Sequence, residues 1–255
     1  MKPRRWAHAA LLSLGVILLL GLGALALRRP SNSREWIADH ARIPTSELQG
    51  ERVHIEGIRD FRYVTAGSVH QDYYDATFTL SKIASLWFVL SIFHEENFRG
   101  PAHSMLSFGF ADGSYVAISV EARKEVGESY SIYQGLLKRY ELIYVIGDER
   151  DLVRTRSVFR PDDVYVYPVR TSKAKIRELF VDMLRSANSL HEKPQFYNTA
   201  FHNCTTVLRD HVNAVAPGRM PHSWKVLLPG YSDELLESLG LLDSDLTVEQ
   251  ARQRY

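Results

Sequence analysis

Residues 103–110 read HSMLSFGF, residues 115–122 read YVAISVEA, and the four residues between them read ADGS. In both runs apolar residues alternate with small or polar ones, which is the period of a β-strand with two different faces. The Asp112-Gly113 pair between the runs is typical of a tight hairpin turn. The sequence therefore predicts an antiparallel hairpin at the centre of the fold.

Further elements are predicted on both sides of this hairpin. Segments with strand character lie at 51–65, 140–146 and 164–169. The apolar stretch 79–93 fits either a helix or strands. Helices are expected at 172–190, with Ser172 as the cap, at 204–215, and as two short pieces within 232–255. Strands followed by helices without regular alternation indicate an α+β fold.

An apolar run precedes this domain. Residues 6–27 contain no Asp, Glu, Lys or Arg, and basic residues flank the run on both sides. About 20 apolar residues cross a bilayer as a helix, so we expect one N-terminal transmembrane helix. The alternative is a cleaved signal peptide, because Ala24-Leu25-Ala26 resembles a cleavage site. The short tail before the run most simply stays in the cytoplasm, which places the domain in the periplasm.

The predicted organisation has four parts, and the bulk composition limits the function of the largest. The parts are an N-terminal membrane anchor at 1–29, a linker at 30–50, the main domain at 51–230 and a C-terminal helical tail at 231–255. A formal net charge of +1 gives no electrostatic reason to expect a nucleic-acid partner. The chain has one cysteine, no HExxH motif and no cysteine pair, so we expect neither a disulfide nor a metal site, and no cofactor.

That cysteine, Cys204, is the candidate nucleophile. It follows Asn203, a good helix cap, and opens the predicted helix 204–215. At the first turn of a helix, the dipole and the free backbone N–H groups favour a thiolate and can hold an oxyanion. A lone cysteine at a helix start is, however, often only a buried small side chain.

His103 is the candidate base. A thiol nucleophile needs an imidazole within hydrogen-bond reach, and His103 shares a small, polar strand face with Ser107 and Gly109. That face leaves room for a helix N-terminus to approach. His202 and His211 are weaker candidates, because His202 points elsewhere in most geometries and His211 lies two turns along the helix.

Glu121 is the candidate partner that orients the imidazole. A two-residue turn pairs His103 with Ala122 and turns Glu121 away. A three-residue loop, or a bulge, pairs His103 with Arg123 and brings Glu121 alongside diagonally. We favour the second arrangement, because it gathers the small and polar residues of both strands on one face.

Several separated stretches resemble a known bacterial family, the Lnb N-terminal periplasmic domain. They are RDFRY (59–63), HSMLSFGFADGSYVAISVEARKEVGESYS (103–131), YELIYVIGDERD (140–151), VYVYP (164–168) and FYNTAFHNCTTV (196–207). The resemblance implies an enzyme of lipoprotein N-acylation. The order of histidine strand, glutamate strand and Asn-Cys helix is also similar to circularly permuted papain-like enzymes such as lecithin:retinol acyltransferase. That similarity implies an antiparallel sheet packed on the nucleophile helix.

The resemblance assigns roles to individual residues. Cys204 is the nucleophile, His103 the base and Glu121 the orienting residue. Around them, we expect the substrate to contact Tyr197, Asn198, Asn203 and Ser107.

Three functions remain open at this point. The leading one is a membrane-anchored thiol acyltransferase that takes an acyl group from a membrane lipid or lipoprotein as a thioester. The second is a cysteine peptidase or amidase of the cell envelope, and the third is a non-catalytic binding or assembly domain. A long apolar slot favours the first and an open polar groove the second. A buried cysteine far from any histidine favours the third.

Overall fold

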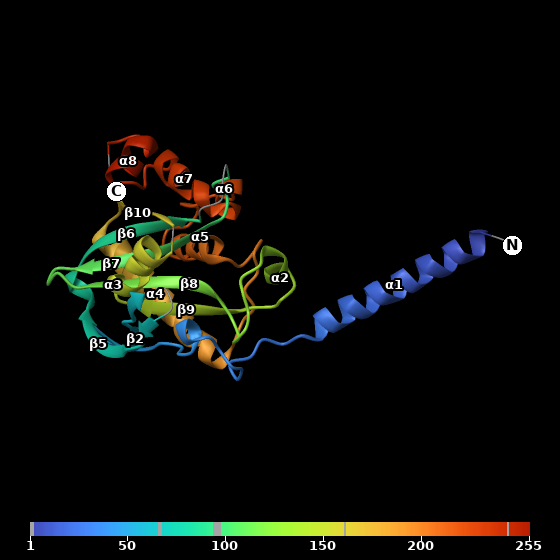
Figure 1. Cartoon of the computed structure of the whole chain (residues 1–255). Helices are drawn as coiled ribbons and strands as arrows, with labels where there is room; N and C mark the ends of the chain where they lie inside the picture. The colour runs from blue at the N-terminus through green and yellow to red at the C-terminus, as the bar shows by residue number, and fades with distance from the viewer. Residues whose placement is uncertain (1–2, 66–67, 94–97, 161, 244) are drawn as a thin grey trace.

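The computed structural model describes residues 3–65, 68–93, 98–160, 162–243 and 245–255, without the side chains of 3–10, 24, 64 and 65. Helix α1 (Pro3–Leu27) extends away from the folded domain (Figure 1), and its described leucines, except Leu25, are exposed. Over the described part of the chain, no helix combines the length and hydropathy needed to cross a membrane. The transmembrane helix expected from residues 6–27 is therefore not supported by the structure.

A large curved sheet forms the centre of the domain. In spatial order its strands are β1 (Thr45–Gln49), β2 (Arg52–Arg59), β9 (Glu141–Gly147), β8 (Tyr115–Arg123), β7 (Ala102–Phe110), β6 (Ile83–Ile92) and β10 (Asp163–Pro168). The neighbours are antiparallel except for β2 and β9, and β5 (Tyr73–Thr79) also pairs with β2. A small ribbon of β3 (Arg62–Thr65) and β4 (Ser68–His70) stands apart. This mixture of helices and a mainly antiparallel sheet is the predicted α+β class.

The stretch 79–93, for which the sequence allowed a helix or strands, is strand β6 after a short 3₁₀ turn at Leu80–Lys82. Its side chains alternate between the two sides of the sheet, so that Phe88 and Leu90 enter one core while Val89 enters the other. Both faces of β6 are covered, which explains an apolar run without visible alternation.

The central hairpin has a three-residue loop. The amide of Phe110 donates across the loop to the carbonyl of Ser114 at 2.9 Å, and Gly113 has φ 85°. Ser107 pairs with Ala117 and Met105 with Ser119. The small and polar residues lie on one face of the hairpin and the large apolar residues on the other, as predicted. The expected pairing of His103 with Arg123 is wrong. The register, continued by two residues, places Glu121 opposite His103.

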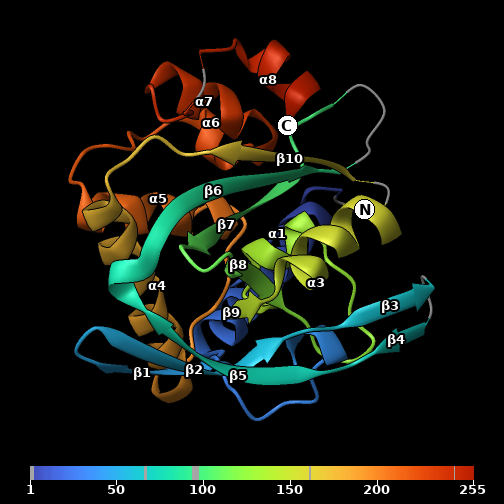
Figure 2. The same cartoon turned by 90° about the vertical axis from the view of Figure 1, so that its left-hand side faces the viewer.

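Long helices cover one face of the sheet and short helical segments cover the other (Figure 2). Helices α4 (Lys173–Glu192) and α5 (Cys204–Val215) lie on one face, and α3 (Glu149–Arg154) and a π-helical turn (Thr155–Phe159) lie on the other. The predicted cap is confirmed, since Ser172 accepts a hydrogen bond from the amide of Lys175. In β7, Leu106 faces α4 and α5, whereas Met105 faces α3. Neighbouring residues of one strand therefore lie in different environments.

The C-terminal segment packs against the larger core. It contains α6 (Trp224–Leu227), α7 (Ser232–Ser238) and α8 (Val248–Arg254), the last capped by Thr247. Leu235 and Ala251 are buried in that core, and Arg252 pairs with the buried Asp233 at 2.8 Å. Helix α2 (Ile132–Leu136) lies on the side of the domain from which α1 departs (Figure 1).

Candidate active site

Cys204 is the first residue of helix α5. The side chain of Asn203 accepts a hydrogen bond from the amide of Thr206, and the Thr206 hydroxyl accepts one from the amide of Asn203. This capping box fixes the start of the helix at Cys204. The predicted position of the cysteine at a helix N-terminus is therefore found.

The thiol of Cys204 is buried among hydroxyl groups. Sγ lies 3.7 Å from Oγ1 of Thr205, which in turn lies 2.9 Å from Oγ of Ser104 on β7. Burial raises the pKa of the Cys204 thiol, which is protonated at neutral pH. In the described residues, the backbone amides of Cys204 and Thr205 have no recorded acceptor. Those two N–H groups are available to hold an oxyanion.

A second cluster of polar side chains surrounds His103. Nε2 of His103 lies 2.6 Å from Oγ of Ser119, and the Ser119 hydroxyl donates to Oε1 of Glu121 at 2.7 Å. Since the only proton of Ser119 is used toward Glu121, the hydroxyl oxygen accepts from His103. Nε2 therefore carries the proton, and Nδ1 keeps its lone pair. Among the described residues, Nδ1 has no recorded hydrogen-bond partner.

Arg156 completes this group from the π-helical turn. Its guanidinium donates to Oε1 of Glu121 at 2.7 Å. Burial, reinforced by the charge of Arg156, lowers the pKa of His103 to about 3. Burial acts to raise the pKa of Glu121, but His103 and Arg156 outweigh it and hold that pKa well below its usual range. At neutral pH the group is a neutral imidazole beside a Glu–Arg ion pair.

His103 and Cys204 do not form a hydrogen bond in this structure. Cys204 packs in the core on the α5 side of the sheet, next to Ser104. His103 is the adjacent residue of β7, and its partners Ser119, Glu121 and Arg156 lie on the α3 side. The structure thus brings His103 and Glu121 together, as the sequence suggested, and places Cys204 beside the same end of β7 on the other side.

The two weaker histidine candidates lie elsewhere. His211 is fixed between the hydroxyl of Tyr144, at 2.6 Å, and the carboxylate of Asp182, at 2.7 Å. His202 pairs through its backbone with Asn198 in the turn before α5. Neither imidazole is hydrogen-bonded to Cys204.

The other predicted contact residues divide between the two sides of the sheet. Tyr197 is buried in the same core as Cys204, and burial strongly raises the pKa of its hydroxyl. Asn198 accepts bonds from the amides of Ala200 and Phe201 and shapes the turn, and Asn203 caps α5. Ser107 instead lies on the α3 side, where its hydroxyl donates to Glu149. The structure therefore does not bring Ser107 near the thiol.

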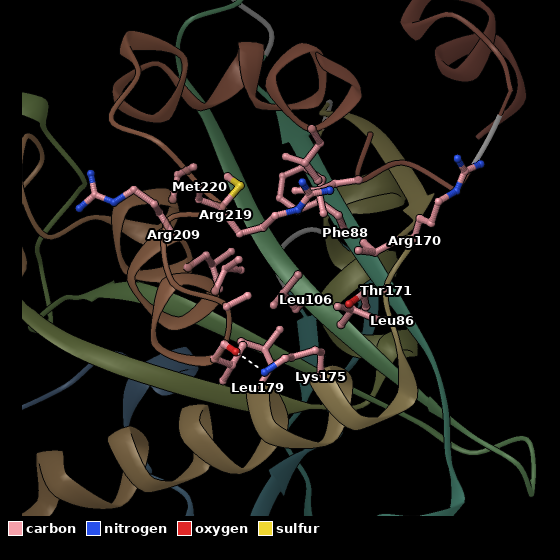
Figure 3. A pocket seen from close by; sticks show the side chains of 18 residues that line it. Leu86, Phe88, Leu106, Arg170, Thr171, Lys175, Leu179, Arg209, Arg219 and Met220 are labelled. Carbon is pink, nitrogen blue, oxygen red and sulfur yellow. Dashed lines mark hydrogen bonds between the residues drawn. The ribbon is translucent and has the colours of Figure 1, made fainter. Parts of the chain in front are cut away.

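An apolar cavity of 270 Å³ lies between α4, α5 and the sheet (Figure 3). Its lining includes Thr205, the residue after Cys204. Its walls are mainly aliphatic and aromatic, with Leu86, Phe88, Leu106, Leu179, Leu208, Val212, Met220, Leu236 and Leu241 among them. Arg170 and Arg209 point away from it, whereas Arg219 reaches across its mouth (Figure 3). Arg219 donates to the carbonyl of Leu239 at 2.7 Å and has no carboxylate partner among the described residues.

Sequence reasoning missed three parts of this region. Arg156 carried no signal, because a π-helical turn has no recognisable sequence pattern. The hydroxyl of Thr205 was visible beside Cys204 in the sequence, and Ser104 beside His103, but their contact depends on tertiary packing. In the part of the chain that the structure describes, no cluster of metal-ligating side chains occurs.

Comparison with known proteins gives one result. A family model described as the Lnb N-terminal periplasmic domain matches residues 70–230, more than half of the 255 residues. The matched segment includes the whole hairpin, the residues around His103, the residues around Cys204 and the start of α5. No match was found among curated proteins or solved structures.

Proposed function

The chain belongs to the Lnb N-terminal periplasmic domain family, which implies a periplasmic location, and on that basis we propose that it is a thiol acyltransferase of the cell envelope. Cys204 takes an acyl group from a membrane lipid or lipoprotein, and an amine or water then accepts it. The observation that carries the proposal is the apolar cavity that reaches Thr205, the residue after Cys204. An aliphatic cavity fits an acyl chain, whereas a peptidase or amidase needs an open polar groove.

The proposed chemistry has two steps. The sulfur of Cys204 attacks the ester carbonyl, its proton passes through His103 to the departing alcohol, and a thioester forms. The acceptor then attacks the thioester, gives its proton to His103, and releases the thiol. The free amides of Cys204 and Thr205 stabilise the oxyanion in both steps. At rest His103 lies on the α3 side of β7 and Sγ of Cys204 on the α5 side, so this proton transfer requires the first turn of α5 to move past the end of β7 when substrate binds.

A second candidate is a lipid-binding envelope protein without catalysis. The buried thiol with a raised pKa and the absent bond between His103 and Cys204 favour it. It uses the same cavity and differs only in forming no covalent intermediate.

Intact-mass analysis of the protein, isolated from its own cell envelope, separates the two candidates. An acyltransferase gives an adduct of acyl mass that hydroxylamine removes and that Cys204→Ser lacks. Noncovalent lipid without an adduct, under conditions in which substrate is present, contradicts the thioester and supports the binding protein. Cys204→Ala, with folding checked by circular dichroism, shows whether lipid still occupies the cavity.

We also propose that α1 attaches the domain to the inner membrane. Its described leucines, except Leu25, are exposed, and an exposed apolar surface of this size marks a site of contact with a membrane or a partner. The full chain is then expected to stay in the membrane fraction after a carbonate wash. Release of a species that begins near Leu27 shows instead that the segment is a cleaved signal.

A further inference from the structure

A patch of exposed apolar side chains surrounds helix α2. We define the α2 patch as Ile132, Tyr133, Leu136, Leu137 and Phe201, which are between 42% and 79% exposed. Exposing a cluster of apolar side chains to water is unfavourable. Such a cluster therefore marks a surface that binds another molecule or a membrane.

The patch is held together by contacts between two segments distant in the sequence. Oγ1 of Thr199 donates to the carbonyl of Ile132 at 3.0 Å. Gly135 is buried against Thr199, where a side chain on residue 135 would collide with the Thr199 hydroxyl. The turn that carries Phe201 is closed by the backbone pair Asn198 and His202. These contacts fix the backbone of both segments, so the patch is an ordered surface.

The patch also lies next to two functional parts of the molecule. Phe201 is three residues before Cys204, and the side-chain amide of Asn203 donates to the carbonyl of Thr199 at 2.7 Å. On the other side, Arg28 directly follows α1 and donates to the carbonyls of Leu137 and Lys138. The end of the apolar helix α1 is therefore joined to the edge of the patch (Figure 1).

The charges around the patch are suited to anionic lipid. Arg28, Arg29 and Lys138 have no carboxylate ion-pair partner among the described residues, whereas Arg139 is paired with Glu128. Unpaired cations at the rim of an apolar surface attract anionic headgroups. Tyrosine and phenylalanine side chains favour the boundary between headgroups and acyl chains.

From these observations we propose that the α2 patch docks on the surface of an anionic phospholipid bilayer, with Tyr133 and Phe201 inserted among the headgroups. The docked orientation brings the turn before Cys204 to the membrane. Docking is a binding property, and it holds whether or not Cys204 becomes acylated.

The test uses the full chain in vesicles of phosphatidylethanolamine and phosphatidylglycerol, without any other protein. In a Cys204→Ser background, Tyr133→Cys and Phe201→Cys each carry an environment-sensitive fluorophore. Glu249→Cys on α8 is the matched control, since the Glu249 side chain is 76% exposed and helix α8 lies far from α1 (Figure 1). The control shows what attachment through α1 alone does to a label on the domain.

Labels at 133 and 201 are expected to emit at shorter wavelength and to be quenched by spin-labelled lipid at a depth of about 5–10 Å into the boundary between headgroups and acyl chains. The label at 249 is expected to remain unquenched. Equal behaviour of all three labels overturns the proposal and leaves the patch as a surface for a protein partner. Replacing phosphatidylglycerol by phosphatidylcholine is expected to reduce the quenching at 133, and unchanged quenching there overturns the role of the rim cations. Because the background lacks the thiol, failure of docking is distinct from failure of acyl transfer.

Discussion

Oε1 of Glu121 lies 3.3 Å from Nε2 of His103 and receives the Ser119 hydroxyl as well. The two side chains come from adjacent antiparallel strands and share the α3 side of the sheet. Glu121 thereby fixes which ring nitrogen of His103 carries the proton, as the orienting carboxylate of a catalytic triad does.

Glu121→Gln is the first test of this arrangement. The amide keeps the shape of the carboxylate but removes the charge that stabilises an imidazolium. In acyl transfer we expect turnover to fall by a factor on the order of 10² to 10⁴. Rates measured with a soluble ester or lipid donor check this, with the circular dichroism spectrum as the control for folding. Unchanged turnover in a folded variant contradicts the orienting role.

Acidification is expected to destabilise the fold through His103 and His40, whose pKa values burial lowers to about 3. The unfolded chain binds a proton on each near pH 6.5, and the folded chain does not. Stability is therefore lost as the pH falls from 6.5 toward 3, and above 6.5 these groups contribute no pH dependence. Between pH 7 and pH 5 each histidine costs about 2 kcal/mol.

Urea denaturation at both pH values measures that loss. His103→Gln removes one titrating group, so its unfolding free energy is expected to change less with pH by about 2 kcal/mol than that of the unmutated chain. A pH dependence identical in both proteins means that His103 titrates normally in the folded state.

Arg156→Met tests the ion pair behind His103. Removing the guanidinium leaves Glu121 as a buried charge without its cation, which we expect to cost about 3–5 kcal/mol of stability. The pKa of His103 is expected to rise, because a repelling cation has gone and the carboxylate remains. Nuclear magnetic resonance titration of the ring follows this directly. A lower or unchanged pKa in the folded variant contradicts the assigned electrostatics.

The proposed binding of an acyl chain in the apolar cavity is tested by filling that cavity. Val212 lines the cavity and Val181 does not, yet both are partly buried against the same core. Val212→Trp is expected to lower the yield of the Cys204 acyl adduct by about tenfold or more, because the indole occupies the space of the chain. Val181→Trp is the control for the general effect of a bulky residue. Equal yields in both variants mean that the acyl chain lies elsewhere.

The sequence predicts local secondary structure well, but it predicts tertiary contacts between side chains poorly. The hairpin, the caps Ser172 and Asn203, and the start of α5 at Cys204 follow from patterns within a few residues. The pairing of His103 depends on the loop length, which Asp112-Gly113 does not determine, because the dipeptide also fits a three-residue loop. Arg156 and the cavity arise only when segments far apart in the chain pack together.

The three-residue loop at Ala111–Gly113 has a consequence for how this protein can change over generations. The length of this loop determines which side chains of β8 lie on the same face of the sheet as Met105 and Ser107 of β7. A loop change that moved the pairing by one residue would turn Ser119 and Glu121 toward the side of the sheet that α4 and α5 cover and would bury Ile118 among charges. A shift by two residues keeps each side chain in its layer. Inherited changes of register in this hairpin are therefore expected to come in even steps.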